Sequence, residues 1–280
     1  MTTFKLGVLG NPVSHSRSPD IHQQFAAATG ISLSYEKVFV SDGSFNSVAN
    51  DFLDSGFGFN ITLPCKHDAW QFVDEASDHA RQAEAVNTIS RTAVGTLRGD
   101  NTDGPGLVND LVQNLGWPLK DRKLLVIGAG GAVSGVLASL LAEAPGALHV
   151  TNRTHDKAQN LEQRFAGTKA FAMDRLQEGY DLVINGTSAG LSHQDLKIPG
   201  SVITENTCCY DMIYGPGTTR FNQWCQKQAK CEVADGLGML VEQAGLAFMI
   251  WFGEQLNAAP DTQSVISTIR NNLDQALKDD

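Results

Sequence analysis

The sequence lacks the features that mark most secreted, membrane-spanning and zinc-binding proteins. It has five cysteines, an odd number, with no C-x-x-C pair and no His–Cys cluster at zinc spacing. We therefore expect reduced thiols, no metal and a cytoplasmic protein. Residues 1–10 carry no signal-peptide pattern, and Glu242, Gln243 and Glu254 interrupt the longest apolar stretch, residues 237–256. No membrane association is therefore expected.

Positive charge is also scarce. The chain has 21 Lys and Arg against 31 Asp and Glu, a formal net charge of -10. A nucleic-acid partner favours a basic surface, so we expect none. An anionic small molecule is not excluded, because one cleft can be basic on an acidic protein. A length of 280 residues is typical of one or two domains.

Residues 124–136 have the pattern of a dinucleotide-binding strand–turn–helix unit. The apolar run Leu-Leu-Val-Ile predicts a strand buried on both faces of a parallel sheet. Gly128, Gly130 and Gly131 then allow a sharp turn and leave room for a phosphate at the N-terminus of the helix that follows. Val133 occupies the third small position of G-x-G-x-x-G, so the match is imperfect. A plain strand-to-helix connection is the alternative.

The residues that follow the next predicted strand, 148–151, distinguish NAD binding from NADP binding. An NAD-binding unit places an acidic residue about 20 residues past the glycines, for the ribose 2′-hydroxyl. Here Arg153 follows the strand, with Lys157 one turn further and no acid at the tip. A guanidinium suits a phosphate, so the sequence favours NADP. A surface Arg–Lys pair is the alternative.

Polar residues gather at predicted strand ends in the first hundred residues. Ser14 and Ser16 lie in a loop before a helix, and Asn60 and Thr62 share one side of a strand. Asp103 precedes a helix N-terminus inside a glycine-bounded turn. Each position also has an ordinary explanation in turn or capping chemistry.

Four other positions are also candidates. Lys66 opens a helical pattern. A cation at this position opposes the helix dipole, which indicates a role with an anion or a proton. Thr187 and Met212 lie in loops that follow buried strands, at the edge where parallel sheets bind ligands. Gln243 is either a satisfied core amide or part of a cleft, and Lys66 is either functional or solvated.

Taken in order, these motifs resemble those of the shikimate dehydrogenase family along nearly the whole chain. Their joint order is highly specific. The matching stretches are Ser14-His-Ser-Arg-Ser-Pro19, Asn60-Ile-Thr-Leu-Pro-Cys-Lys66, Ala85-Val-Asn-Thr88, Gly99-Asp-Asn-Thr-Asp103, Gly128-Ala-Gly-Gly-Ala132, Asn152-Arg-Thr154, Asn185-Gly-Thr-Ser188, Tyr210-Asp-Met212 and 234–243.

The resemblance implies an α/β fold with three parts. An N-terminal α/β substrate domain with a mixed sheet would span 1–103, and a Rossmann-type doubly wound NADP-binding domain would span 104–236. C-terminal helices over 237–280 would return to the first domain. The implied activity is the NADPH-dependent, reversible reduction of 3-dehydroshikimate to shikimate in aromatic amino-acid biosynthesis, by a monomer or homodimer.

The same resemblance implies the site residues. Lys66 and Asp103 would form the catalytic pair. The substrate would be held by Ser14, Ser16, Asn60, Thr62, Lys66, Asn87, Asp103, Tyr214 and Gln243. The NADP cofactor would be held by Gly128, Ala129, Gly130, Gly131, Ala132, Asn152, Arg153, Thr154, Lys157, Thr187, Met212 and Gly236. No metal is required, because the nicotinamide carries the hydride.

The chain departs from the family pattern at a few positions. Cys65 adjoins the predicted catalytic lysine, and we expect the ammonium to favour a modifiable thiolate there. Val133 and Ser134 replace a common Ser-Arg pair after the glycines, which would weaken the phosphate contact. Thr218 replaces a frequent lysine after residues 210–217, a loop expected to be mobile.

Two alternatives remain open at this point. One is a quinate/shikimate dehydrogenase that uses NAD. Ser14 and Ser16 together favour shikimate over quinate, and Arg153 favours NADP. The other alternative is a catalytically silent sensor on the same fold, against which the presence of both Lys66 and Asp103 argues.

Overall fold

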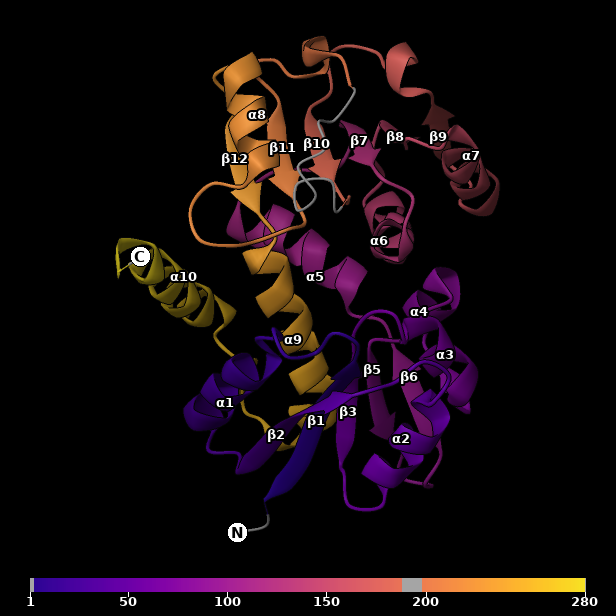
Figure 1. The fold of residues 1–280 in the computed structure, drawn as a ribbon, viewed down its shortest axis with the longest axis vertical. Coiled ribbons are helices and arrows are strands. Elements are labelled where there is room, and N and C mark those ends of the chain that lie inside the picture. Colours follow the sequence, from indigo (N-terminus) through magenta and orange to yellow (C-terminus); the bar gives the residue numbers. More distant parts are fainter. Residues whose placement is uncertain (1–2, 188–197, 280) are drawn as a thin grey trace. The chain divides into compact units, whose positions relative to one another are not determined.

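The computed structural model describes residues 3–187 and 198–279 (Figure 1). The chain forms two compact units. Unit 1 comprises Met1–Gly106 and Val241–Val265, and unit 2 comprises Leu107–Leu240 and Ile266–Asp280. Each unit has its own six-stranded sheet.

The sheet of unit 1 is mixed. Its strands are β1 (Phe4–Gly10), β2 (Leu33–Phe39), β3 (Gly58–Ile61), β4 (Glu75–Ala76), β5 (Thr88–Arg91) and β6 (Leu97–Asp100). They lie in the order β2-β1-β3-β5-β6-β4, with β1 parallel to β2 and β3, and β5 antiparallel to β3 and β6. The α-helices that begin before residue 107 are α1 (Ser18–Thr29), α2 (Phe45–Leu53), α3 (Lys66–Phe72), α4 (Asp78–Ala83) and α5 (Asp103–Asn109).

Two cores cover the two faces of this sheet. On one face, Leu9, Phe59 and Ile89 pack with the buried side chains of α2 and α3. On the other face, aromatic side chains of α1 meet those of α9 (Leu237–Phe252): the Phe25 and Phe248 rings lie 5.6 Å apart. The α9 helix, whose residues from 241 onward belong to unit 1, is thereby fixed against this sheet.

The sheet of unit 2 is entirely parallel. Its strands are β7 (Lys123–Ile127), β8 (Ala147–Thr151), β9 (Thr168–Phe171), β10 (Leu182–Asn185), β11 (Cys208–Asp211) and β12 (Glu232–Asp235). The order β12-β11-β10-β7-β8-β9 is the 3-2-1-4-5-6 order of the Rossmann fold, read from the other edge and counted from β7. The order reverses between β7 and β10, which is where such sheets bind ligands.

Side chains of β7 alternate between two cores, as expected for a strand covered on both faces. Leu124 and Val126 pack toward α6 (Gly131–Ala142) and α7 (His155–Arg164), and Leu125 and Ile127 pack toward α8 (Arg220–Gln228). The buried strand predicted at 124–127 is therefore confirmed, and unit 2 is doubly wound as expected.

The last helix, α10 (Thr262–Asp279), differs from the expected arrangement. Its residues from Ile266 onward group with unit 2, whereas the sequence-based division put all of 237–280 with the first domain. The contacts give the reason. Arg270 bonds the carboxylate of Asp235 and the carbonyl of Gly215, both in unit 2.

Two further findings concern membranes and metals. In the described ranges, no helix is long and apolar enough to cross a membrane. Within those same residues, no group of three or more His, Cys, Asp or Glu side chains is arranged to hold a metal ion.

Candidate active site

One edge of the unit 1 sheet collects most of the predicted polar residues. Ser14 and Ser16 follow β1, Thr62 follows β3, and Asp103 follows β6. Since β1, β3 and β6 run in one direction, their carboxyl ends lie at the same edge. Asn87 precedes β5, which runs the opposite way, so it reaches that edge too.

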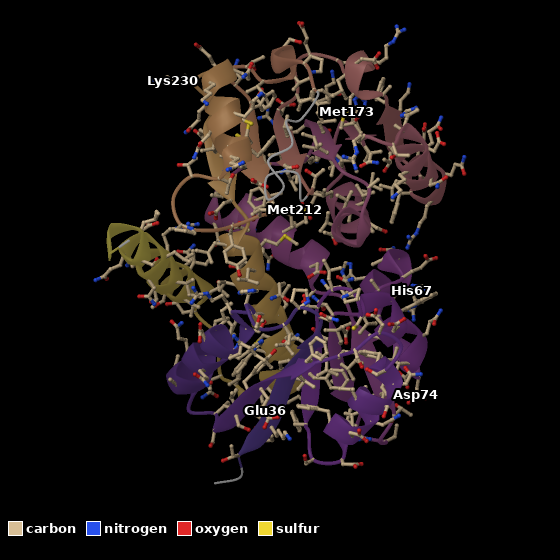
Figure 2. All side chains as sticks on the ribbon, in the orientation of Figure 1. Glu36, His67, Asp74, Met173, Met212 and Lys230 are labelled. Atoms are coloured by element: carbon tan, nitrogen blue, oxygen red, sulfur yellow. The ribbon has the colours of Figure 1, made fainter. Side chains whose placement is uncertain are left out.

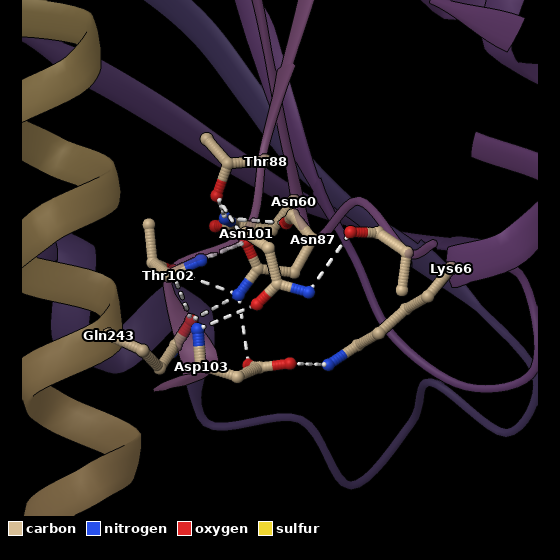
Figure 3. A network of polar contacts seen from close by, with 9 residues as sticks. Asn60, Lys66, Asn87, Thr88, Asn101, Thr102, Asp103 and Gln243 are labelled. Carbon is tan, nitrogen blue, oxygen red and sulfur yellow. Dashed lines mark hydrogen bonds and ion pairs between the residues drawn. The ribbon is translucent and has the colours of Figure 1, made fainter. Parts of the chain in front are cut away.

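Lys66 and Asp103 form an ion pair at this edge (Figure 3). Lys66 is the first residue of α3 and Asp103 the first of α5. The Lys66 Nζ lies 2.5 Å from Asp103 Oδ2, with the side chains 23% and 13% exposed. An ammonium has three donor hydrogens and this pair uses one. The cation is therefore held in place while solvent, and so a ligand, can reach it.

Asn87 holds the other carboxylate oxygen. Its Nδ2 donates to Asp103 Oδ1 over 2.9 Å, and its Oδ1 accepts from the Thr102 backbone N–H over 3.0 Å. Asn87 is buried. Lys66 and Asn87 therefore fix the two oxygens of Asp103 separately, and the carboxylate plane is set before any ligand binds.

Gln243 reaches the same network from α9, although it lies 156 residues after Asn87 in the chain. Its Oε1 accepts from Asn87 Nδ2 and from Thr102 Oγ1, each over 3.4 Å. In Figure 3, Gln243 and Lys66 approach Asp103 from opposite sides. The predicted residues Lys66, Asn87, Asp103 and Gln243 are thus brought together.

Asn60 lies beneath this group and uses all of its hydrogen-bonding capacity internally. Its Nδ2 donates to the Asn87 carbonyl over 3.1 Å and to Thr88 Oγ1 over 3.0 Å. Its Oδ1 accepts from Tyr35 Oη–H over 2.6 Å and lies 3.1 Å from His22 Nε2. A side-chain amide makes four hydrogen bonds, so all four positions of Asn60 are occupied by protein groups.

This arrangement also fixes the state of His22. The Asn87 carbonyl can only accept, which places Nδ2 of Asn60 beside it and Oδ1 beside His22. The His22 imidazole must therefore donate from Nε2. Burial lowers the pKa of His22 from 6.5 to about 3, with the Asn60 hydrogen bond opposing the shift, so the ring is neutral near pH 7.

The serines and Thr62 lie outside the hydrogen bonds of this cluster. Ser16 Oγ donates to Ser18 Oγ and accepts from the Ser18 N–H, each over 3.2 Å. Ser14 is exposed, and its carbonyl accepts from Lys37 Nζ over 2.7 Å. The helix begins at Ser18 itself, with Arg17 as N-cap and no side-chain cap.

In unit 2, the glycine turn leaves the first turn of α6 open. Gly128 ends β7 at φ 120°, a conformation that favours glycine. A Cβ placed on Gly130 or Gly131 would meet no described atom within 4 Å. Ala132 is exposed in the same turn. These glycines are therefore not required by packing, and the space and the helix N-terminus suit an anionic group.

Two cations stand at the tip of β8. Arg153 and Lys157 are both exposed, and Thr154 between them is the N-cap residue of α7. Asn152 Nδ2 donates to the Thr154 carbonyl over 2.9 Å, which tightens this turn. The pair and the helix N-terminus together present positive potential where a 2′-phosphate would be expected.

The remaining cofactor candidates follow β10, β11 and β12. Thr187 donates from its backbone N–H and its Oγ1 to Asn185 Oδ1, over 3.1 and 2.7 Å. A Cβ at Gly236 would lie 2.3 Å from the Met212 carbonyl oxygen, so only glycine fits there. Met212 is labelled in Figure 2. Ser188, the last residue of the 185–188 motif, lies outside the described residues.

Comparisons with known proteins agree with this geometry. A family model described as "Shikimate dehydrogenase substrate binding domain" matches residues 8–89, and one described as "Shikimate / quinate 5-dehydrogenase" matches 110–193. The shikimate dehydrogenase (NADP(+)) of Chromobacterium violaceum is 46% identical over 276 residues, covering 97% of this chain and 99% of that protein. This chain belongs to the shikimate dehydrogenase family.

Two more relatives support the assignment. The shikimate dehydrogenase (NADP(+)) of Alkalilimnicola ehrlichii is 46% identical over 272 residues, with 96% of this chain and 99% of that protein covered. The crystal structure of shikimate 5-dehydrogenase from Thermus thermophilus in complex with NADP(H) and shikimate matches with a TM-score of 0.85 and 31% identity, covering 96% and 99% of the two chains.

One expectation about this family member is wrong. Cys65 is buried, and desolvation together with the charges of Asp68 and Asp42 raises the pKa of its thiol. A raised pKa leaves less thiolate, so the structure opposes the modifiable cysteine expected beside Lys66.

The structure also reveals a cation that sequence reasoning missed. Arg164, the last residue of α7, donates from Nη1 to Ser134 Oγ over 3.0 Å. Ser134 lies in the first turn of α6. Nothing in the sequence around Arg164 indicates this contact, because the residue lies in a polar stretch that shows no apolar helical pattern.

Proposed function

We propose that this chain is an NADP-dependent shikimate dehydrogenase that reduces 3-dehydroshikimate to shikimate with NADPH, and runs reversibly. Unit 1 would bind the substrate and unit 2 the cofactor. The observation that carries the proposal is the Lys66–Asp103 ion pair, fixed by Asn87 at an edge lined with hydroxyl and amide groups. Family membership gives the substrate class, and the ion pair gives the chemistry.

Lys66 is the proton donor of the proposed reduction. Reduction of a ketone develops negative charge on its oxygen, and an ammonium at that oxygen stabilises the charge and delivers the proton. Asp103 holds the Lys66 Nζ in place and accepts a hydrogen bond from a substrate hydroxyl. In the reverse direction, Lys66 takes the proton from the shikimate hydroxyl.

Several side chains would hold the polyhydroxylated ring. Asn87 and Gln243 present amides beside Asp103, and Ser14, Ser16 and Thr62 follow the neighbouring parallel strands of the same sheet. Asn60 acts from below, since its four hydrogen bonds go to protein groups. Tyr214 is a proposed substrate contact from unit 2.

The residues of unit 2 fit NADP. The open first turn of α6 accepts a diphosphate, while Arg153 and Lys157 accept the 2′-phosphate, and Thr187, Met212 and Gly236 lie at strand ends beyond the switch point. When bound, NADPH supplies the hydride. All five cysteines are free thiols, which supports a reducing compartment such as the cytoplasm.

Steady-state rates with shikimate or quinate, each paired with NADP or NAD, test the proposal. We expect the highest kcat/KM with shikimate and NADP. A preference for quinate or NAD would favour the quinate/shikimate dehydrogenase alternative. No turnover in any pairing would favour the silent sensor.

Replacing Lys66 by Ala tests the proposed proton donor. We expect kcat to fall by about 10²–10⁴, the usual contribution of general acid–base catalysis, with the Kd for shikimate changing far less. Lys120→Ala, at an exposed position in unit 2, is the control. Unchanged turnover in Lys66→Ala would remove Lys66 from this role.

A further inference from the structure

Arg270 of α10 joins two parts of unit 2 that lie far from it in the sequence. Its Nη2 lies 2.5 Å from Asp235 Oδ1 at the end of β12, and its Nη1 donates to the Gly215 carbonyl over 3.0 Å. Asp235 is 8% exposed and Arg270 31%. A single planar guanidinium therefore ties the loop of residues 212–219 to the end of a sheet strand.

The start of the 212–219 loop is fixed by other contacts. The Ile213 N–H donates to Asp211 Oδ1 over 3.2 Å, and the Ile213 carbonyl accepts from the Gly236 N–H over 3.1 Å. Asp235 is itself held, because its Oδ1 also accepts from the Leu237 N–H over 3.1 Å. The loop therefore leaves β11 along a defined path.

The far end of the loop is fixed by α8. Thr219 caps this helix by accepting from the Asn222 N–H over 3.3 Å, and Gln223 Nε2 donates to the Thr218 carbonyl over 2.8 Å. Residues 216–218 are exposed. Between the two fixed ends, Arg270 holds the loop through the Gly215 carbonyl.

We propose that Arg270 is a positioning residue, which holds the 212–219 loop so that Met212 and Tyr214 are ordered before ligand binding. This inference rests on the proposed function, in which Tyr214 contacts the substrate and Met212 contacts NADP. Arg153 and Lys157 would hold the 2′-phosphate at the tip of β8. Met212 follows β11 on the other side of the switch point, so it would face the nicotinamide half. Without Arg270, the loop must be ordered during binding, and that ordering weakens affinity. It also gives the terminal helix a role in unit 2.

The matched variants are Arg270→Ala, Arg270→Lys and Asn271→Ala. Asn271 is exposed on the same helix and serves as the control. Lysine keeps the charge but lacks the fork that bridges carboxylate and carbonyl, so it should rescue the alanine variant only in part. Thermal melting of each variant establishes that the full chain is folded.

Two binding measurements separate a local effect from a general one. Calorimetric titration gives the Kd for NADP⁺ and for adenosine 2′,5′-bisphosphate, which lacks the nicotinamide. We expect Arg270→Ala to raise the Kd for NADP⁺ about tenfold, in line with the loss of one charge-assisted contact, and to leave the Kd for the bisphosphate within twofold.

Limited chymotrypsin digestion reports on the loop without any ligand. We expect cleavage after Tyr214, identified by mass spectrometry, to be several times faster in Arg270→Ala than in the parent chain or Asn271→Ala. Unchanged cleavage would show that Arg270 does not hold the loop. Faster cleavage with an unchanged Kd for NADP⁺, or an equal loss of affinity for both ligands, would overturn the positioning role. A parent chain that binds no NADP⁺ would refute the proposed function, whereas the cleavage rates would still show whether Arg270 holds the 212–219 loop.

Discussion

His22 offers a prediction whose size follows from the structure. The imidazole is fully buried, stacks on Tyr35 at 4.8 Å and donates to Asn60, which supports the candidate site. Its Nδ1 is buried with no hydrogen-bond partner among the described residues. A proton added to His22 would therefore place a charge in an apolar core, beneath Asn60 and Asn87.

The sign and size of the pH effect follow from the lowered pKa. Burial lowers the pKa of His22 from 6.5 to about 3. Below pH 6.5 the unfolded chain binds a proton that the native chain does not, so stability from this group is complete above pH 6.5 and is lost as the pH falls toward 3. The loss is about 1.4 kcal/mol per pH unit, or about 2 kcal/mol at pH 5.

The variant His22→Gln isolates this effect. Glutamine can still donate to Asn60 but does not titrate. It will lower stability at pH 7 through lost packing, so the quantity of interest is how the difference from the parent changes with pH. Between pH 7 and pH 5, we expect this difference to shrink by about 2 kcal/mol.

Urea unfolding followed by tryptophan fluorescence at both pH values gives that difference. Trp251, whose ring centroid lies 5.4 Å from that of His22, reports on this core. His15→Gln, at an exposed position in the same unit, is the control and should show no such change. A His22→Gln difference that is the same at pH 7 and pH 5 would refute the buried neutral imidazole.

Two further predictions concern a side chain in each unit that bonds a residue at or beneath the candidate site. Tyr35→Phe removes one donor to Asn60 Oδ1. We expect a stability loss of about 1 kcal/mol and a several-fold lower kcat, with the KM for shikimate within twofold of the parent. A raised KM with unchanged kcat would instead make Asn60 a substrate ligand. Arg164→Gln removes the guanidinium beside Ser134. We expect its KM for NADP to be several-fold higher than that of the parent at low salt, and the two KM values to converge at high salt. Arg175→Gln, in a 3-10 turn after β9, is the control, and an equal change there would contradict a specific role for Arg164.

The sequence predicts an element best where the local residues favour a single backbone conformation. The apolar run before Gly128 predicts a buried strand, and β7 confirms it. A glycine after an apolar helical pattern predicts the end of a helix, and Gly30 ends α1 at φ 75°. In each case, propensity, apolar period and a terminating residue agree.

Elements with little apolar surface were missed. The α7 helix buries only Ala158 and Leu161 within a polar sequence, so no apolar stripe marks it. Strands β4, β6 and β9 have two to four residues each, too few to show an alternating pattern. The helix that begins at Asp103 changes to a π-helical turn at Asp110–Asn114, which no local motif in the sequence indicates.

The sequence motifs named Lys66, Asn87, Asp103 and Gln243, and the structure brings these four together. Sequence could not assign what each atom does, because that depends on partners from distant strands. Asn60 illustrates this, since its partners Tyr35 and His22 lie 25 and 38 residues away. A motif identifies the position, and only the fold shows whether its amide faces a ligand or the core.

The buried polar side chains beneath the candidate site also depend on partners from distant strands and helices. Tyr35 and His22 fix Asn60, Asn60 donates to the Asn87 carbonyl, and Asn87 donates to Asp103. Each step as far as Asn87 is a hydrogen bond between buried groups, and a group left unpaired there would cost about 1–3 kcal/mol. The carboxylate that holds the Lys66 ammonium is therefore oriented by the core of unit 1. Substitutions at Tyr35 should then act mainly on kcat, whereas substitutions at Ser14, which has no place in this chain of bonds, should act mainly on KM for shikimate.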